Sequence, residues 1–156
     1  MVDFKSQLRK GIAAHERASA AKQEVSSILE DLTAQIEEYT NGRVGITVKE
    51  ETSLANTIRA IAAMGSGAPE KLPLKTQFVL VAYDKSSGEA KRLASWTQEP
   101  TGYPCTLRFG DANREAYDRK SLEAILGELL SSAETGRIIS SIVSKSHKLV
   151  EDDSAT

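Results

Sequence analysis

The residue types that most often do chemistry are few in this chain. It holds one cysteine, Cys105, and two histidines, His15 and His147. Cys105 shares the apolar face of a predicted strand with Leu107 and Phe109, which alternate with polar residues. A thiol in such a position is usually chemically inert and contributes only to packing. Neither histidine has a spacing typical of a catalytic triad or a metal site. The sequence therefore predicts no catalytic residue, no metal and no cofactor, and it favours a protein that is not an enzyme.

A different chemistry, the binding of an anion, is indicated in the middle of the chain. Basic and aromatic residues alternate there, and guanidinium groups bind phosphates while aromatic rings stack on bases. We name four candidate ligand-binding residues: Arg92, Trp96, Tyr103 and Arg108. The expected ligand is a small anion such as a nucleotide, or single-stranded nucleic acid. Core packing competes for the same rings, because the chain has only one tryptophan, four tyrosines and three phenylalanines.

A glycine-rich segment, Met64–Lys71, invites comparison with phosphate-binding loops. It lacks the Gly-Lys-Ser/Thr ending of such loops, and it follows a predicted helix, capped at Thr52 or Ser53, instead of a strand. We interpret it as an ordinary loop.

Composition excludes several classes of protein. The chain has 156 residues, enough for one domain with a real core, and 27% of them are charged with a net charge of only -2. That balance predicts neither a strong nucleic-acid footprint nor an acidic mimic of DNA. A single cysteine indicates a reducing compartment, and no apolar stretch has the length of a membrane span. We expect a cytoplasmic protein with no membrane partner.

One long helix is predicted at the N-terminal end. From Phe4 to Tyr39 no proline interrupts, and the apolar positions step by three and four as in a heptad repeat. Such a helix spans about 50 Å, more than a domain of this size is wide. Either it breaks near Gly11 or Ser19 into two helices on one domain, or it stays continuous and pairs with a second copy or a target protein.

The heptad seam carries large apolar residues only in the second half of this helix. We predict these as the oligomer interface: Val25, Leu29, Leu32 and Ile36. Charge is also divided, because residues 1–22 hold five basic and two acidic side chains, whereas residues 23–51 hold two basic and seven acidic ones. Antiparallel pairing of two helices would join opposite charges. The alternative is an ordinary solvated helix face.

The rest of the chain alternates strand-like runs with turns. Asn41-Gly42 is a helix stop, and Asp84–Gly88 and Glu99–Pro104 are turns. The run Phe78–Tyr83 is apolar on both faces, so we expect helices on each side of it. Most peptide bonds before proline are trans, but the trans preference is weaker there, so the sequence leaves the isomer of Tyr103-Pro104 open. Strands are predicted near residues 44–48, 78–83, 90–97, 105–109 and 114–117, and helices over 118–130 and 131–150.

These elements predict an α+β fold with a long N-terminal helix as a dimerisation element, a mainly antiparallel sheet of four to five strands, and a C-terminal helical pair. The expected organisation is a helical arm over residues 1–40, a compact domain over 41–150 and a frayed tail over 151–156. We expect a non-enzymatic interaction protein, a homo-oligomeric binder or inhibitor of another protein, by analogy with small adaptors, immunity proteins and phage-encoded inhibitors of host defence. The alternative is a binder of the anionic ligand described above.

Overall fold

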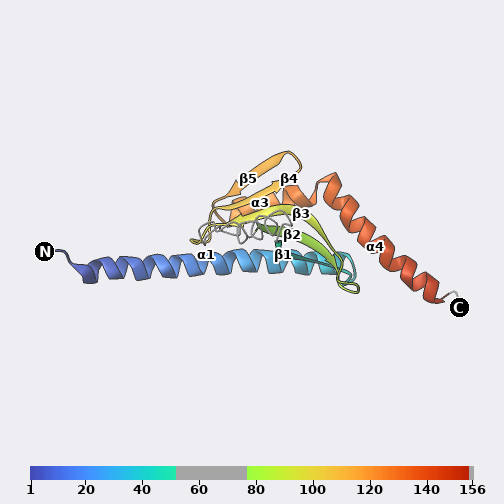
Figure 1. The fold of residues 1–156 in the computed structure, drawn as a ribbon, viewed down its shortest axis with the longest axis horizontal. Helices are drawn as coiled ribbons and strands as arrows, with labels where there is room; N and C mark the ends of the chain where they lie inside the picture. Colours follow the sequence, from blue (N-terminus) through green and yellow to red (C-terminus); the bar gives the residue numbers. More distant parts are fainter. Residues whose placement is uncertain (52–76, 155–156) are drawn as a thin grey trace, which may run out of the picture.

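The computed structural model describes residues 1–51 and 77–154, with side chains up to Lys145. The predicted helix after Thr52 and the segment Met64–Lys71 lie outside the described residues. The α+β fold is confirmed (Figure 1). Its elements in chain order are α1 (Phe4–Tyr39), β1 (Val44–Glu51), β2 (Gln77–Asp84), β3 (Ala90–Gln98), β4 (Cys105–Phe109), β5 (Ala112–Ala116), α3 (Arg119–Leu130) and α4 (Ala133–Ser154).

Helix α1 is one continuous helix of 36 residues, about 54 Å long. Asp3 caps its first turn by accepting a hydrogen bond from the Ser6 amide, at 3.3 Å. It runs through Gly11 without interruption, so the alternative of a break near Gly11 or Ser19 is wrong. It ends where predicted, because Asn41 and Gly42 adopt the left-handed conformation, with φ of 55° and 77°.

The five strands form an antiparallel meander in the order β1-β2-β3-β4-β5. Short turns explain the pairing of β2 with β3, of β3 with β4 and of β4 with β5, since strands joined by tight turns pair with their sequence neighbours. The β2–β3 register shifts between Leu80 and Val81, which is a bulge in the centre of the sheet. Strand β5 is an edge strand that carries the charges of Arg114 and Glu115, which discourage pairing with other sheets.

Two of the turns are well defined by their side chains. Asp84 accepts hydrogen bonds from the Ser86 amide at 2.9 Å and from the Ser86 hydroxyl at 2.7 Å, and the hydroxyl is the main reason that the pKa of Asp84 is lowered. In the β3–β4 turn, Gly102 has φ of 95° and lies against Ala21 of α1. The Tyr103-Pro104 peptide in this turn, whose isomer the sequence left open, is cis.

All three described helices pack on one face of the sheet. Their apolar stripes meet the inward side chains of the strands in one cluster, to which α1 contributes Val25 and Ile28. The Thr33 hydroxyl also donates a hydrogen bond to the Ile46 carbonyl of β1, at 2.7 Å. The prediction of a helix on each side is therefore not met within the described residues. On the opposite face, Val79 and Val81 are buried without belonging to this cluster. The core members from α3 and α4 are Leu122, Ile125, Leu126, Leu129, Ile138 and Ile142.

Helix α4 runs to Ser154, beyond the end predicted near Val150. Figure 1 shows that it leaves the sheet at the end opposite to the N-terminal half of α1. The two ends of the described chain therefore lie at opposite ends of the long axis of the molecule (Figure 1).

Candidate functional site

The face of the sheet that the described helices leave open is called the outer face here, and its part on β3 and β4 is polar. Alternation along β3 and β4 directs Ser95, Thr97, Thr106 and Arg108 to this face, and the register places Ser95 opposite Arg108 and Thr97 opposite Thr106. The bulge in β2–β3 brings Arg92 to the same face, opposite Val81. Two guanidinium groups and three hydroxyls thus share one surface.

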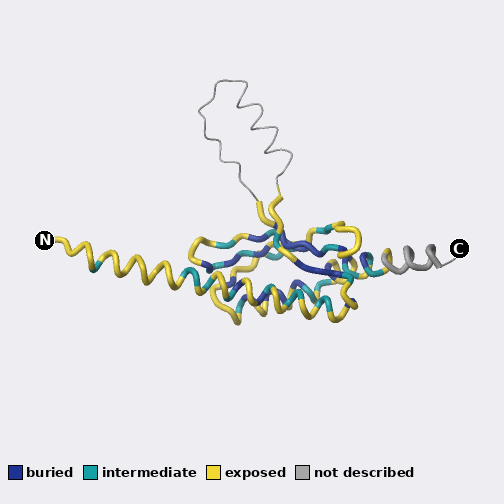
Figure 2. Tube along the Cα trace, turned by 90° about the horizontal axis from the view of Figure 1, so that it is seen from below, coloured by how far each residue is buried: buried dark blue, intermediate teal, exposed yellow. Residues whose placement is uncertain are grey.

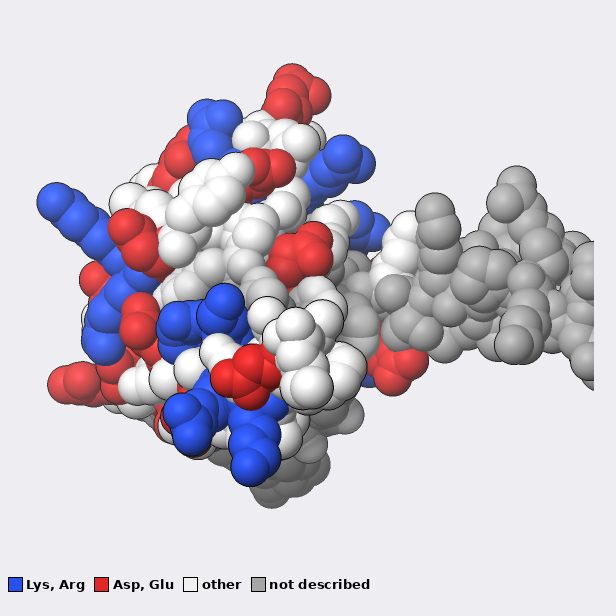
Figure 3. Space-filling view, turned by 90° about the vertical axis from the view of Figure 1, so that its left-hand side faces the viewer, with Lys and Arg blue, Asp and Glu red and all other residues white. Residues whose placement is uncertain are grey.

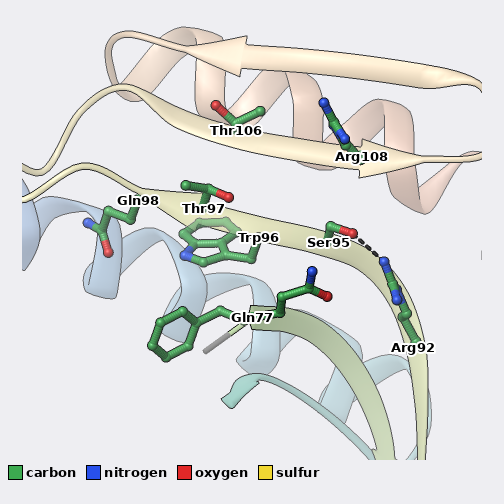
Figure 4. A pocket seen from close by; sticks show the side chains of 9 residues that line it. Gln77, Arg92, Ser95, Trp96, Thr97, Gln98, Thr106 and Arg108 are labelled. Atoms are coloured by element: carbon green, nitrogen blue, oxygen red, sulfur yellow. Dashed lines mark hydrogen bonds between the residues drawn. The ribbon is translucent and has the colours of Figure 1, made fainter. Parts of the chain in front are cut away.

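A hollow of about 700 Å³ lies over these residues, within the size range of small-molecule sites. Figure 4 shows Arg92 and Ser95 of β3 joined by a hydrogen bond, with Arg108 on the neighbouring strand β4. The end of β2 completes one wall. The residues that line the hollow are Gln77, Phe78, Arg92, Ser95, Trp96, Thr97, Gln98, Thr106 and Arg108.

The two arginines of the hollow are weakly neutralised. Arg92 is 3.8 Å from the carboxylate of Glu51, and both side chains are about half exposed. An ion pair of this kind contributes about 0.2–1 kcal/mol, so an anionic ligand can compete for Arg92. Arg108 is exposed and forms no ion pair with any described residue. The outer face therefore offers positive charge to a ligand.

The structure brings together three of the four predicted ligand-binding residues. Arg92, Trp96 and Arg108 line the hollow, but Trp96 is only 4% exposed and offers little ring surface for stacking. Tyr103 lies elsewhere. Its hydroxyl donates a hydrogen bond to Glu24 of α1 at 3.0 Å, and burial together with this bond raises the pKa of Tyr103. Tyr103 thus fastens the β3–β4 turn to α1.

Sequence reasoning missed the polar residues that surround the arginines. Ser95, Thr97 and Thr106 become neighbours only through the β3–β4 register. Phe78 pairs with Trp96, whose side chain is in the core, so alternation directs Phe78 to the helix-covered face of the sheet. Alternation of polar residues along β3 and β4 was a usable signal for the hydroxyls. No signal in the sequence identified the register.

The predicted oligomer interface is used within the chain. Val25 is buried in the core, and Leu29, Leu32 and Ile36 pack against that core. These four side chains keep little surface for a second copy. Whether two chains associate stays a prediction.

The exposed apolar surface of α1 lies instead in its first half, residues Phe4–Arg17, which we call the arm. Figure 2 shows that the arm extends past the sheet and is exposed along nearly its whole length. Phe4, Leu8 and Ile12 are 77%, 64% and 51% exposed. Their spacing of four residues places them on one side of the helix as a continuous apolar stripe. The heptad analysis included Phe4 and Leu8 but not Ile12.

Seen from the N-terminal end of α1, the surface carries basic and acidic side chains that are interspersed (Figure 3). No single sign of charge dominates this view. A broad electrostatic attraction for a polyanion is therefore not indicated on this face.

Cys105 has the inert character that its alternation predicted. Its side chain is fully buried, and this burial raises the pKa of the thiol to about 11. Among the described residues, no three His, Cys, Asp or Glu side chains gather where they could hold a metal ion. Within the same part of the chain, no helix has the length and apolarity needed to cross a membrane.

Comparison of the chain with models of protein families, with curated proteins and with solved structures found no match.

Proposed function

We propose that this protein is an interaction protein that self-associates through its arm. The observation that carries the proposal is the apolar stripe of Phe4, Leu8 and Ile12, held away from the domain on a continuous helix. Single exposed apolar residues are common, but three large ones in a row on a projecting helix are typical of a binding surface. The proposed interface is the arm and not the predicted seam of Val25, Leu29, Leu32 and Ile36, because these four side chains pack in the core of the same chain or against it.

A second copy fits this stripe by its symmetry. In an antiparallel pair of arms, Leu8 of one chain can lie against the partner's Ile12 while the same contact forms again on the other side of the two-fold axis. The charged residues beside the stripe are also compatible with antiparallel pairing. Lys5 and Glu16 are eleven residues apart, so they lie on the same side of the stripe, where antiparallel helices bring Lys5 beside the partner's Glu16.

The expected association is weak. Burying an apolar side chain contributes about 1.5–3 kcal/mol, and six such side chains must offset an association cost of roughly 4–15 kcal/mol. A dissociation constant in the micromolar range or weaker is the reasonable expectation. A weak, reversible dimer suits a regulatory or adaptor role, and we place the protein in the cytoplasm, where its single buried thiol stays reduced.

Sedimentation of the full chain over a wide concentration range tests the proposal. We expect a monomer–dimer equilibrium that Leu8→Gln and Ile12→Gln each weaken at least tenfold. Glutamine preserves helix propensity, and the arm makes no core contacts, so the variants should fold normally. The matched control is Ala13→Gln on the opposite side of the arm, which should leave the equilibrium unchanged.

Two results would overturn the proposal. The full chain could remain a monomer at millimolar concentration, in which case the stripe does not bind a second copy. Alternatively, Ala13→Gln could weaken the dimer as much as Leu8→Gln, which would show that the stripe is not the interface.

A further inference from the structure

We propose that a crevice between the C-terminal end of α1 and helix α4 binds a small carboxylate that carries a hydrocarbon group, with the carboxylate on Arg43. The crevice has a volume of about 360 Å³, near the lower end of the range of small-molecule sites. It is lined by residues 39–41 and Arg43 on one side and by Ile139, Ser140, Val143 and Ser144 of α4 on the other. Figure 1 shows that the C-terminal end of α1 and helix α4 lie at the same end of the molecule, whereas the arm projects from the other end. The site is therefore separate from the arm and does not depend on self-association.

The turn between α1 and β1 fixes the backbone of Arg43. The Arg43 carbonyl accepts a hydrogen bond from the Lys85 amide at 2.9 Å, and the Arg43 amide donates one to the Thr40 carbonyl at 3.3 Å. Thr40 is buried, and its hydroxyl accepts a hydrogen bond from the Val44 amide at 3.1 Å. A ligand on Arg43 would thus meet a backbone that is already held on both sides, which lowers the entropic cost of binding.

One nitrogen of the Arg43 guanidinium, Nη1, is buried and has no hydrogen-bond partner among the described residues. No other buried side-chain nitrogen or oxygen in that part of the chain shares this property. Arg43 also forms no ion pair with a described residue. Buried donors are nearly always hydrogen-bonded and buried charges are paired, so this guanidinium indicates a binding site for an acceptor. Water would supply a hydrogen bond but no charge, whereas an anion supplies both.

The walls of the crevice favour an organic anion with a single charge. Ile139 and Val143 are one turn apart on α4 and contribute hydrocarbon, as does the exposed ring of Tyr39 in α1. Arg43 is the only cation among the described residues that line the crevice, and none of them is acidic. Phosphate groups are typically bound by clusters of arginines. One guanidinium instead matches the single charge and the two oxygens of a carboxylate, and the apolar walls match a hydrocarbon group attached to it.

Calorimetric titration of the full chain with 3-phenylpropionate tests the site, and the uncharged 3-phenylpropionamide is the matched ligand. We expect the carboxylate to bind roughly tenfold or more tightly than the amide. Arg43→Met keeps the apolar stem of the side chain, so it should remove this difference by weakening only the carboxylate. Ser144→Glu, at an exposed position that lines the crevice, should also weaken the carboxylate because the new side chain competes for Arg43.

The matched control is Arg137→Met, which should leave the binding of the carboxylate unchanged. Arg137 is an exposed arginine of α4 that does not line the crevice and is paired with Glu134. This control lowers the net charge by one unit, as Arg43→Met and Ser144→Glu do, so it isolates the local effect. An equal loss of binding in Arg137→Met would indicate general charge attraction and overturn the inference.

Denaturant unfolding provides a readout that needs no ligand. Arg43→Met should unfold at a higher denaturant concentration than the unsubstituted chain, because it removes a buried charged donor that no described residue satisfies. Arg137→Met should not increase stability. A loss of stability in Arg43→Met would mean that the guanidinium is satisfied within the fold, which would overturn the inference.

Three binding results would also overturn it. Absence of binding up to about 10 mM carboxylate would mean that the crevice takes up water only. Equal binding of the carboxylate and the amide would mean that Arg43 does not recognise the ligand. Tighter binding of inorganic phosphate than of the carboxylate would identify a phosphate site instead. Leu8→Gln should bind the carboxylate normally, so the dimer and the ligand site can fail independently.

Discussion

At the scale of single residues, a comparison of two glycines distinguishes the effect of backbone strain from that of a steric clash. Gly88 and Gly102 both have positive φ, 76° and 95°. A Cβ on Gly88 would meet nothing within 4 Å, whereas a Cβ on Gly102 would lie 2.5 Å from Cβ of Ala21 in α1. Replacing Gly102 by alanine therefore combines a strained backbone with a clash against α1.

We expect Gly88→Ala to lower the free energy of unfolding by about 1–2 kcal/mol, and Gly102→Ala to lower it by about 2–4 kcal/mol. Denaturant unfolding of the two variants measures the difference. Equal losses would mean that the β3–β4 turn does not press on α1.

The candidate ligand-binding residues differ in how far the sequence could predict their positions. Arg108 lies on the outer face as alternation along β4 indicates, whereas Arg92 reaches that face only through the β2–β3 bulge. Tyr103 was misplaced because its partner, Glu24, is seventy-nine residues away in the chain. Proximity of that kind depends on how α1 crosses the sheet, and no local pattern encodes it.

At the scale of elements, α1 combines two environments in one helix. Its second half is fixed by the core, while the arm has no described tertiary partner for its apolar stripe. Helix formation in the arm is helped by the packed half, which supplies the nucleus that an isolated helix of this length lacks. Gly11 is the weak point, because glycine costs about 1 kcal/mol relative to alanine inside a helix.

Gly11→Ala should therefore stabilise the arm without affecting the core, since an added Cβ meets nothing within 4 Å. We expect more helical circular dichroism and a dimer that is up to about 30-fold tighter, the factor equivalent to about 1 kcal/mol in each of its two arms. Gly136→Ala in α4 is the control, also free of contacts, and it should leave the dimer unchanged. An unaltered dimer in Gly11→Ala would argue against an arm interface.

The heptad pattern predicted the continuity and the end of α1, but not the surface it packs on. An apolar stripe with Val25, Leu29, Leu32 and Ile36 suits a sheet as well as a second helix. Packing on the sheet and packing on a second helix differ only in whether the rest of the same chain covers the stripe. That depends on the tertiary fold and not on the sequence of α1.

At the scale of the whole molecule, the distribution of charge distinguishes two possible dimers, one with arm against arm and one with the arm against the second half of another α1. The arm holds Lys5, Arg9, Lys10 and Arg17 against one acidic residue, Glu16, so two arms repel each other at long range. The antiparallel pairing suggested by charge alone would instead set the arm beside the acidic second half of another α1.

Raising the salt concentration from 50 to 500 mM should tighten an arm-to-arm dimer, because it screens the repulsion between like charges. Sedimentation at both salt concentrations measures the shift. A dimer that weakens with salt would indicate opposite charges at the interface, and hence contact between the arm and residues 23–39.

The part of the meander from β2 to β5 was predictable because its turns are short and rich in glycine, proline and aspartate. The side of the sheet that the helices cover was not, because Phe78–Tyr83 is apolar on both faces. Burial of Val79 and Val81 shows that both faces of this strand are shielded, although the described helices cover one.

The pairing of β1 with β2 continues to the last residue of one strand and the first of the other, Glu51 opposite Gln77. The residues on either side of the segment 52–76 are therefore neighbours in the sheet. Loop closure costs only about 0.6 kcal/mol for each doubling of length, whereas one residue added to a tight turn would shift a strand register. In evolutionary terms, this junction is where the protein can gain or lose sequence while its sheet stays the same.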